Sequence, residues 1–368
     1  MTLEPTEIFL AAQPGLEAPL ADEAREAGFA RVAAVPGGVT VAGGWDEVAR
    51  ANLALRGAGR VLARIGGFPV FHLAQLDKRA RKFGWSAVLR PDVPVKIETT
   101  CLRSKVYHAG AATQRIARAI TEELGAEVVS EGPALRLMVR IEDNFCTFSI
   151  DTSGEPLHRR GHKAFVGKAP LRETMAALFL RQCGYRGDEP VVDPMCGSGT
   201  IVLEAAEMAL GLPPGRGRRF AYQDLAVPVA APAAPAPAPR DIALRFTGAD
   251  RDSGAIQGAG ANAARAGLEE VTTFLRQPVS ELARPEGPPG LVMVNPPYGG
   301  RIGNKRQLFG LYNALGAVLL ERFSGWRVGI VTSEAGLARA TALPFAETGP
   351  PVAHGPLKIR LHRTDPLP

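Results

Sequence analysis

Two short motifs combine residue types that could bind a small molecule and hold a flat polar base. They are Asp193-Pro-Met-Cys-Gly-Ser-Gly-Thr200 and Asn295-Pro-Pro-Tyr298, about a hundred residues apart. Each follows an apolar run typical of a short strand, Pro190–Val192 for the first and Gly290–Val294 for the second. Because ligands bind at the carboxyl ends of parallel strands, we expect the two motifs to form halves of one site.

The first motif has the features of a cofactor turn. Its glycines let the backbone turn sharply and approach a ligand, and the next helix offers unpaired N–H groups. About fifty residues later Asp250 stands at the tip of the next strand, where its carboxylate can accept hydrogen bonds from ribose hydroxyls. The turn lacks a third spaced glycine and a Gly-Lys-Thr phosphate loop, which favours a nucleoside without a pyrophosphate.

The second motif can grip an exocyclic amino group. The side-chain oxygen of Asn295 and the carbonyl of Pro296 can both accept hydrogen bonds from an NH2 group and aim its lone pair at a methyl carbon. The prolines remove competing N–H donors, and Tyr298 can stack on a flat ring. The motif predicts methylation of an amino group with S-adenosylmethionine as the donor. Adenine N6, cytosine N4, guanine N2 and a glutamine amide all remain open as acceptors.

The elements that must position these motifs alternate between helices and short apolar strands from Leu171 onward. Besides the two strands above, we expect helices at Leu171–Cys183 and Ile201–Leu210 and strands at Ile242–Ala249, Val271–Leu275 and Arg327–Val331. This alternation predicts an α/β fold with a mainly parallel, doubly wound sheet. The stretch 226–239 is Ala/Pro-rich, which is incompatible with a helix interior or a sheet, so we expect a surface loop.

The first half of the chain is typical of an α+β arrangement. We expect helices at Leu16–Ala27, Ala74–Phe83 and Ser104–Leu124, and strands at Ile8–Ala12, Val39–Ala42, Val95–Thr100, Leu135–Ile141 and Phe145–Ile150. Residues 1–57 carry 4 Lys/Arg against 8 Asp/Glu, whereas residues 58–168 carry 18 against 11. The excess of positive charge in the middle segment favours a nucleic-acid face, with a merely solvated basic surface as the alternative.

The composition argues against several other classes of protein. Four cysteines lack Cys-x-x-Cys spacing and six histidines are dispersed, so we expect neither a metal site nor a disulfide framework. No apolar run reaches the length of a membrane span, and the first residues lack the basic start of a leader peptide. We expect a cytoplasmic protein, monomeric and without a membrane partner.

Longer stretches resemble the methyltransferases that carry a THUMP RNA-binding domain. Residues 168–204 resemble the start of their catalytic domain, residues 151–161 their linker, and residues 99–108 the entry to their THUMP helix. The most similar branch is the large-subunit ribosomal RNA guanine-N2 methyltransferases, and the tRNA acceptor-stem enzymes are near relatives. The resemblance implies a ferredoxin-like unit at 1–57, a THUMP domain and linker at 58–163, and a Rossmann-like class I methyltransferase domain at 164–368.

The motifs and the resemblance together give a set of candidate site residues. Those expected to contact S-adenosylmethionine are Lys168, Pro170, Asp193, Pro194, Cys196, Gly197, Ser198, Gly199, Thr200, Asp250, Arg251 and Gln277. Those expected to hold the target amino group are Asn295, Pro296, Pro297 and Tyr298. Those expected at the RNA backbone are Arg103, Lys105, Arg159, Arg160 and Lys163, the first two at the start of a helix. Gln277 replaces the acid that such enzymes often place at the adenine, so Ser280 and Glu281 are alternatives there.

The resulting hypothesis is N2-methylation of a guanine in 23S ribosomal RNA, with S-adenosylmethionine as cofactor and RNA as partner. A tRNA guanine-N2 methyltransferase is the first alternative, and a DNA adenine-N6 methyltransferase is the second. A nucleotide-dependent oxidoreductase would need a fuller glycine fingerprint and would not explain Asn295–Tyr298. An RNA-binding assembly factor with an inactive methyltransferase fold is the remaining alternative.

Overall fold

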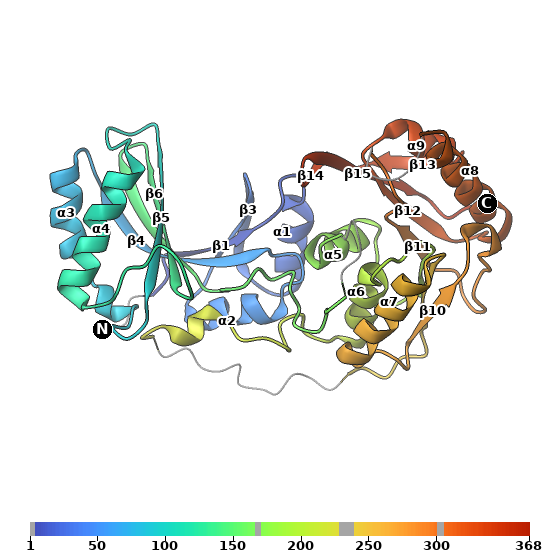
Figure 1. The fold of residues 1–368 in the computed structure, drawn as a ribbon, viewed down its shortest axis with the longest axis horizontal. Coiled ribbons are helices and arrows are strands. Elements are labelled where there is room, and N and C mark those ends of the chain that lie inside the picture. Colours follow the sequence, from blue (N-terminus) through green and yellow to red (C-terminus); the bar gives the residue numbers. More distant parts are fainter. Residues whose placement is uncertain (1–3, 166–170, 228–238, 300–304) are drawn as a thin grey trace. The chain divides into compact units, whose positions relative to one another are not determined.

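The computed structural model describes residues 4–165, 171–227, 239–299 and 305–368. These residues form two compact units, each built on its own sheet (Figure 1). The first unit draws on residues within 1–12, 20–157 and 218–235, and the second on residues within 13–19, 158–217 and 236–368. The domain boundaries at 57/58 and 163/164 stay a prediction.

The first unit contains a seven-stranded sheet in the order β2-β3-β1-β4-β7-β6-β5. Its strands are β1 (Glu7–Ala11), β2 (Ala30–Val35), β3 (Gly38–Ala42), β4 (Arg60–Pro69), β5 (Val95–Leu102), β6 (Leu135–Glu142) and β7 (Phe145–Asp151). Neighbouring strands are antiparallel except β5 and β6, which run parallel. The helices in this half of the chain are α1 (Glu17–Glu26), α2 (Trp45–Ala54), α3 (Leu73–Arg81) and α4 (Ala109–Leu124), with short 3-10 turns at η1 (Trp85–Ala87) and η2 (Ala221–Asp224).

Strand β4 makes one sheet out of the two ends of this unit. Its residues 60–64 pair with β1, and residues 62–69 pair with β7. The β7 register shifts between Arg64 and Gly66, and Gly66 has a φ of +134°, which a residue with a side chain rarely adopts. A single long strand therefore hydrogen-bonds to both halves of the sheet.

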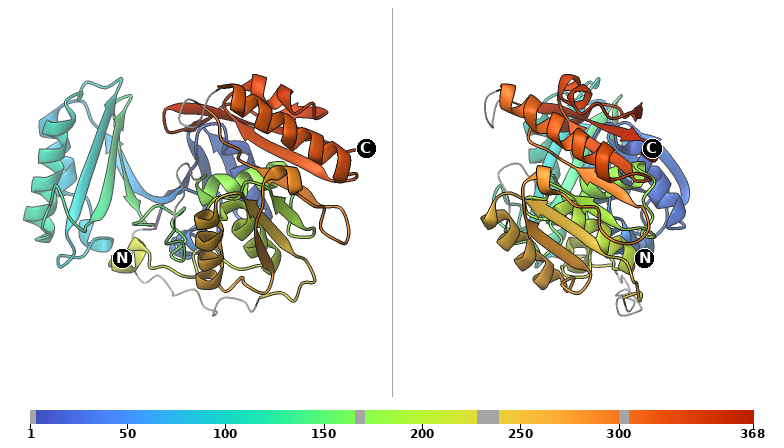
Figure 2. Two further views of the ribbon diagram at one scale, coloured as in Figure 1. Left: turned by 45° about the vertical axis from the view of Figure 1, so that its right-hand side comes forward. Right: turned by 90° about the vertical axis from the view of Figure 1, so that its right-hand side faces the viewer.

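Helices α3 and α4 lie together on one face of the β4–β7–β6–β5 part of the sheet (Figure 2). The alternating burial along β6 explains this packing, because Leu135, Leu137, Val139 and Ile141 are all buried and share one face. The expected helix over Ser104–Leu124 starts later than predicted. α4 begins at Ala109, and the ring nitrogen of His108 accepts the N–H of Ala111 as its cap. Arg103 and Lys105 lie in the loop before this helix, so the expectation that they begin it was wrong.

The second unit contains an eight-stranded sheet in which β10-β9-β8-β11-β12-β15-β13 run side by side and β14 pairs with β15. The strands are β8 (Val191–Asp193), β9 (Phe246–Asp250), β10 (Thr272–Arg276), β11 (Leu291–Val294), β12 (Arg327–Thr332), β13 (Phe345–Thr348), β14 (Val352–His354) and β15 (Leu357–Thr364). The helices are α5 (Glu173–Gln182), α6 (Thr200–Leu210), α7 (Ser253–Ala266), α8 (Lys305–Arg322) and α9 (Ala335–Ala340), with a 3-10 turn at η3 (Val279–Glu281). The strands from β10 to β12 are parallel, which confirms the predicted doubly wound sheet.

The strand order reverses between β8 and β11. From β8 the chain proceeds to β9 and β10 on one side, and from β11 it proceeds to β12 on the other. Right-handed crossovers then place α6 and α7 on one face and α8 on the other, as Figure 1 shows. An apolar core including Tyr312, Leu315, Phe323 and Trp326 packs α8 and its C-terminal end onto the sheet. Such a reversal opens a crevice at the carboxyl ends of the two central strands.

Candidate active site

Both sequence motifs leave the sheet at this reversal. Val191 and Val192 of β8 pair in parallel with Leu291 and Val292 of β11, so the two strands end side by side. The first motif begins with the last residue of β8, and Asn295 directly follows β11. On the other flank of β8, Asp193 pairs with Gly248, two residues before Asp250 ends β9. Sheet topology therefore brings the three predicted strand-end groups to one edge.

The glycine turn between β8 and α6 is held by backbone hydrogen bonds. The N–H of Cys196 donates to the carbonyl of Ala249 at 2.9 Å, and the N–H of Gly199 donates to the carbonyl of Cys196 at 2.8 Å. Gly199 has a φ of +82°, and an added Cβ would lie 3.2 Å from the ring of Phe274. Gly197 has a φ of +52° but faces open space among the described residues. The second glycine is therefore needed for packing, whereas the first leaves room for a ligand.

Asp250 fastens this turn to the neighbouring strand. One carboxylate oxygen accepts the N–H of Gly197 at 3.1 Å, and the other accepts the N–H of Asp252 at 3.0 Å. Asp252 in turn caps α7 by accepting the N–H groups of Gly254 and Ala255. Each carboxylate oxygen has two lone pairs, so Asp250 can still accept hydrogen bonds from two hydroxyls. Its placement fits the ribose-binding role predicted from the sequence.

Asp193 lies deeper than Asp250. It is 2% exposed, and one of its oxygens accepts the N–H of Met195 at 3.0 Å. Burial is the main cause that raises the pKa of Asp193 to about 8, and the nearby charge of Asp250 raises it further. A raised pKa favours the neutral form of Asp193, and a cation bound beside it, such as a sulfonium nucleoside with an amino-acid group, would favour the ionised form.

Two side chains that the sequence did not single out for this role support the turn from behind. Asn262 of α7 is fully buried, and its amide donates to the carbonyls of Ser198 at 3.1 Å and Phe165 at 3.0 Å. The ammonium group of Lys163 donates to Thr200 Oγ1 at 2.6 Å and pairs with Glu173 at 2.8 Å. An Asn inside a helix gives no sequence signal of this kind, because its partners are more than sixty residues away.

The Asn295 loop contrasts with the glycine turn. The Oδ1 atom of Asn295 is buried and has no hydrogen-bond partner among the described residues. A buried acceptor without a donor is costly, and such atoms in native proteins call for an explanation. Pro296 is buried and Pro297 half-buried beside it, and neither has an N–H that could satisfy the oxygen. The acceptor predicted to receive an amino group therefore lacks a donor among the residues that the structure describes.

Tyr298 is held at both ends. Its ring is partly buried against the apolar core under α8, and its hydroxyl lies 3.0 Å from Nδ1 of His354 at the end of β14. Sequence reasoning missed His354, because a lone histidine near the end of the chain carries no motif. The contact fixes the direction of the ring beside Asn295.

The other predicted cofactor residues have varied surroundings. Pro194, Cys196, Ser198 and Thr200 are all buried in or beside the turn. Burial raises the pKa of the Cys196 thiol well above its usual range, so this residue packs under the turn and is unsuited to act as a nucleophile. Arg251 is exposed, and the N–H of Gln277 donates to the carbonyl of Asp250 at 3.1 Å. Lys168 and Pro170 lie outside the described residues.

Two of the predicted RNA contacts do not suit that role. Arg160 is 2% exposed, and its guanidinium pairs with the buried Glu204 at 2.9 Å. Lys163 is engaged behind the glycine turn as described above. We expected both to meet RNA phosphate because they lie in a basic, polar stretch, but each is taken up by an acid of the second unit. Arg159, Arg103 and Lys105 are exposed, and their contact with RNA stays a prediction.

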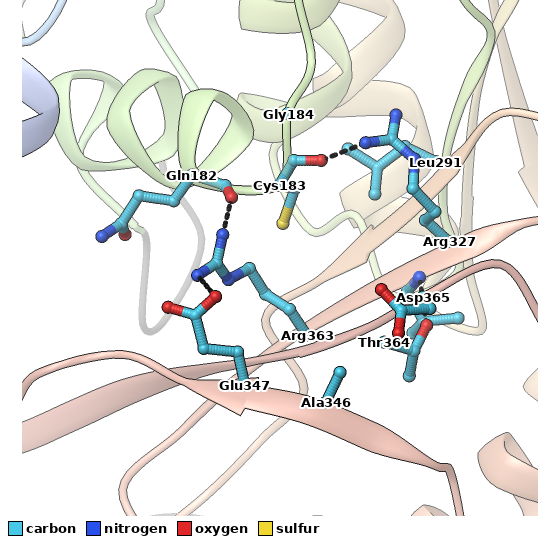
Figure 3. Close-up of a pocket in the computed structure, with 11 residues that line it drawn as sticks. Gln182, Cys183, Gly184, Leu291, Arg327, Ala346, Glu347, Arg363, Thr364 and Asp365 are labelled. Atoms are coloured by element: carbon cyan, nitrogen blue, oxygen red, sulfur yellow. Dashed lines mark hydrogen bonds and ion pairs between the residues drawn. The ribbon is translucent and has the colours of Figure 1, made fainter. Parts of the chain in front are cut away.

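A separate pocket of about 220 Å³ lies at the opposite end of the strands (Figure 3). Its lining includes Leu291 and Arg327, the first residues of β11 and β12. The two arginines in it bind the C-terminal end of α5: Arg327 donates to the carbonyl of Cys183 and Arg363 to that of Gln182. They also pair with Glu189 and Glu347. The pocket thus has a structural explanation and is remote from the motifs.

The described residues offer neither a cluster of metal ligands nor a helix able to span a membrane. No group of three or more His, Cys, Asp or Glu side chains there could hold a metal ion. No described helix combines the length and apolar character that crossing a bilayer would require.

Comparison with solved structures places this architecture among known proteins. The protein SMU.472, solved in complex with SAH, is 24% identical with a TM-score of 0.86 and full coverage of both chains. A protein from Listeria monocytogenes, described as a predicted N6-adenine-specific DNA methylase, is 28% identical with a TM-score of 0.84, covering 97% of this chain and 95% of that chain. TrmN from Thermus thermophilus is 21% identical with a TM-score of 0.77, covering 98% and 99%. The first and third show the shared fold alone.

Family models match three consecutive parts of the sequence. Residues 7–62 match an RlmL ferredoxin-like domain, residues 72–151 match a THUMP domain, and residues 160–348 match the UPF0020 family, described as an RMKL-like methyltransferase domain. The predicted order of a ferredoxin-like part, a THUMP domain and a Rossmann-like catalytic domain is confirmed. With more than half of its length matched by that last model, this chain belongs to the RMKL-like methyltransferase family.

Proposed function

We propose that this enzyme transfers a methyl group from S-adenosylmethionine to N2 of a guanine in large-subunit ribosomal RNA. The observation that carries the proposal is the buried Oδ1 atom of Asn295 beside the glycine turn, which has no hydrogen-bond partner within the described part of the chain. An amino group on a base would supply the missing donor. The finer choice of guanine N2 rests on the resemblance to the guanine-N2 branch of the family.

The cofactor half supports a nucleoside with a positively charged end. Asp250 presents a carboxylate at the tip of β9, and Gly197 faces open space among the described residues. The buried Asp193 lies at the same edge, where a cation would favour its ionised form. When bound, S-adenosylmethionine would supply an electrophilic methyl group on its sulfonium. We propose that Asp250 holds its ribose and that the residues of the turn, Asp193 to Thr200, enclose the remainder.

The chain's own contribution to the chemistry is alignment. Asn295 Oδ1 and the carbonyl of Pro296 would accept hydrogen bonds from the two amino N–H groups and turn the nitrogen lone pair toward the glycine turn. The ring of Tyr298 is fixed by the apolar core and by His354, and a base stacked on it would lie parallel to it. The amino nitrogen lies within a helix in paired RNA, so a base in a duplex would have to be extruded to reach the loop.

RNA as the partner is supported by the THUMP match and by the basic middle segment. Transfer RNA is an alternative from the same class. The description of the Listeria protein favours a different candidate, methylation of adenine N6 in DNA, since Asn295 could hold that amino group equally well. Purified protein offered labelled S-adenosylmethionine with ribosomal RNA, tRNA or DNA would separate the three.

The decisive experiment maps modified nucleosides in RNA from a strain that lacks the gene. We expect loss of one N2-methylguanosine in large-subunit ribosomal RNA, and its return when the gene is restored. Loss confined to tRNA would replace the ribosomal assignment. An unchanged RNA profile together with methyl transfer to DNA would overturn the RNA proposal.

A further inference from the structure

The buried side chain of Asn262 joins two stretches of backbone that are far apart in the sequence. One is the glycine turn between β8 and α6. The other comprises residues 160–165, which lead into the catalytic domain and which we call the entry segment. Asn262 lies on α7, is fully buried and hydrogen-bonds to both stretches. Because a buried polar side chain is stable only where its groups are hydrogen-bonded, its partners show what this residue holds together.

Both ends of the Asn262 amide are used. Its Nδ2 group donates to the carbonyls of Ser198 at 3.1 Å and Phe165 at 3.0 Å. Its Oδ1 atom accepts the N–H groups of Ala164 and Phe165, each at 3.2 Å, and a hydrogen bond from the guanidinium of Arg265. A carboxylate at this position would set an oxygen against both carbonyls, so the arrangement requires an amide.

Two further contacts bind the entry segment to α7. The ring of Phe165 lies so close to the helix that a Cβ added at Gly258 would be 2.2 Å from a ring carbon. The guanidinium of Arg265 donates to the carbonyl of His162 at 2.8 Å. The entry segment therefore follows α7 over several residues, and Asn262 lies between these two contacts along the helix.

Lys163 connects the entry segment to the glycine turn directly. Its ammonium group donates to Thr200 Oγ1 at 2.6 Å, at the start of α6, and pairs with Glu173 at 2.8 Å. The two side chains of this ion pair are only 10% and 9% exposed, so salt screens them little. The entry segment is thus fixed to the turn at two points: at Ser198 through Asn262, and at Thr200 through Lys163.

The Ser198 contact also affects the donor that the turn can offer to a ligand. The N–H groups of Cys196, Gly197 and Gly199 all donate to other protein groups, whereas no acceptor for the N–H of Ser198 lies among the described residues. The carbonyl of Ser198 is the atom that Asn262 holds. Fixing this carbonyl restricts rotation of the Ser198 backbone and thereby sets the direction of its N–H group. Displacing the Asn262 amide would therefore alter the turn itself.

We propose that Asn262 is a positioning residue that couples the cofactor in the glycine turn to the entry segment. A cofactor that orders the turn strengthens the bond to Ser198 and, through the same amide, the bonds to Ala164 and Phe165. The coupling is reciprocal, so releasing the entry segment from Asn262 weakens cofactor binding. The inference rests on the cofactor part of the proposed function and is independent of which base is methylated.

The first test measures the affinity of the full chain for S-adenosylmethionine by calorimetry. Asn262→Asp keeps the size of the side chain and removes both donated bonds. We expect an affinity about 10- to 100-fold weaker, the effect of losing a buried hydrogen bond and leaving its carbonyl unsatisfied. Ala263→Gly is the matched control, because it weakens the same helix at a buried position and removes none of these bonds. Its melting temperature should fall while its cofactor affinity stays unchanged.

The second test starts from the wild type, so it does not depend on the folding of a variant. Hydrogen exchange in a peptide covering residues 160–165, followed by mass spectrometry, should slow when S-adenosylmethionine is added. The reason is that the amides of Ala164 and Phe165 donate to Asn262. In Asn262→Asp at saturating cofactor this protection should be lost. A purely structural Asn262 would leave exchange in the entry segment indifferent to the cofactor.

Three results would overturn the inference. One is an unchanged cofactor affinity in Asn262→Asp. Another is an equal loss of affinity in Ala263→Gly, because the loss would then follow the stability of α7. The third is exchange at residues 160–165 that ignores the cofactor in the wild type, or that the cofactor still slows in Asn262→Asp. A wild type that binds S-adenosylmethionine and shows the coupling but methylates no guanine would sink only the proposed base.

Discussion

The glycine turn and the Asn295 loop follow adjacent strands at the same edge of one sheet, yet they differ in how their polar atoms are hydrogen-bonded. In the turn, Asp250, Asp193 and the buried Asn262 all have hydrogen-bond partners within the protein. In the loop, the Asn295 oxygen has none among the described residues. Under the proposed function, the turn would be a preformed surface for the cofactor, and the loop would leave one acceptor available for the amino group of the target base.

This contrast predicts that substitutions in the two regions affect different steps. Damage to the loop should reduce methyl transfer while cofactor binding survives. Damage to the turn should reduce cofactor affinity first. The following substitutions test that division, beginning with the largest expected effect.

Asn295→Ala should lower kcat by about a hundredfold or more, the usual effect of removing one preorganised hydrogen-bonding group from an active site. The affinity for S-adenosylmethionine, measured by calorimetry, should not change, because the proposed partner of this side chain is the target base. The variant also removes a buried acceptor that has no donor among the described residues, so its thermal stability should equal or exceed that of the wild type. Full transfer activity in this variant would refute the amino-group clamp.

Asp250→Ala should weaken cofactor binding by about 10- to 100-fold, since it removes a charged acceptor for the ribose and a partner of the Gly197 N–H. Asp252→Ala is the matched control, two residues along the chain. It removes the cap of α7 and should cost about 1 kcal/mol of stability while sparing the cofactor. If both variants lost cofactor affinity equally, the loss would reflect a loosened turn and not a missing ribose contact.

Asp193 should make stability depend on pH. Its pKa is near 3.8 in the unfolded chain and about 8 in the fold, so the folded state retains a proton that the unfolded chain has released between those values. The free energy of unfolding should therefore fall as pH rises from about 4 to about 8. Asp193→Asn should remove this slope and be more stable than the wild type at pH 8 by at least about 1 kcal/mol. Denaturant melts at several pH values measure it, and parallel slopes in the two proteins would contradict the assignment.

Tyr298→Phe should have the smallest effect, a loss of roughly 2- to 10-fold in kcat, because it removes one hydrogen bond to His354 and keeps the ring. His354→Ala should produce a similar loss. If His354 acts through the tyrosine hydroxyl, the double variant should be no worse than either single one. Additive losses would show that the two residues act independently.

Sequence patterns predicted most of the second unit, because its two motifs and its strand–helix alternation can each be recognised from nearby residues. A short apolar strand followed by a glycine turn or by Asn-Pro-Pro-Tyr can be recognised from a few neighbouring residues, and strand–helix alternation implies the parallel sheet. β13 and β14 were not predicted, because strands of four and three residues carry little periodicity. β15 was missed as well, although Leu357, Ile359 and Leu361 alternate with polar residues along it. His354 was missed with them.

The sequence did not predict which charged side chains would be buried. Arg160 and Lys163 stand in a basic stretch, but their partners Glu204 and Glu173 come from later helices. Nothing local shows that a guanidinium will be enclosed with a carboxylate. The opposite case is Tyr107, whose 82% exposure could not be foreseen either, because an aromatic residue near a helix is buried more often than not.

Strand β4 limits where this chain can be divided into stable fragments. The RlmL ferredoxin-like match ends at residue 62 and the THUMP match begins at residue 72, so the break between the two modules falls within β4 or just after it. A fragment cut there would keep either β1 or β7 with an unpaired edge, a template for aggregation. Shortened versions of this enzyme should therefore end outside the shared strand.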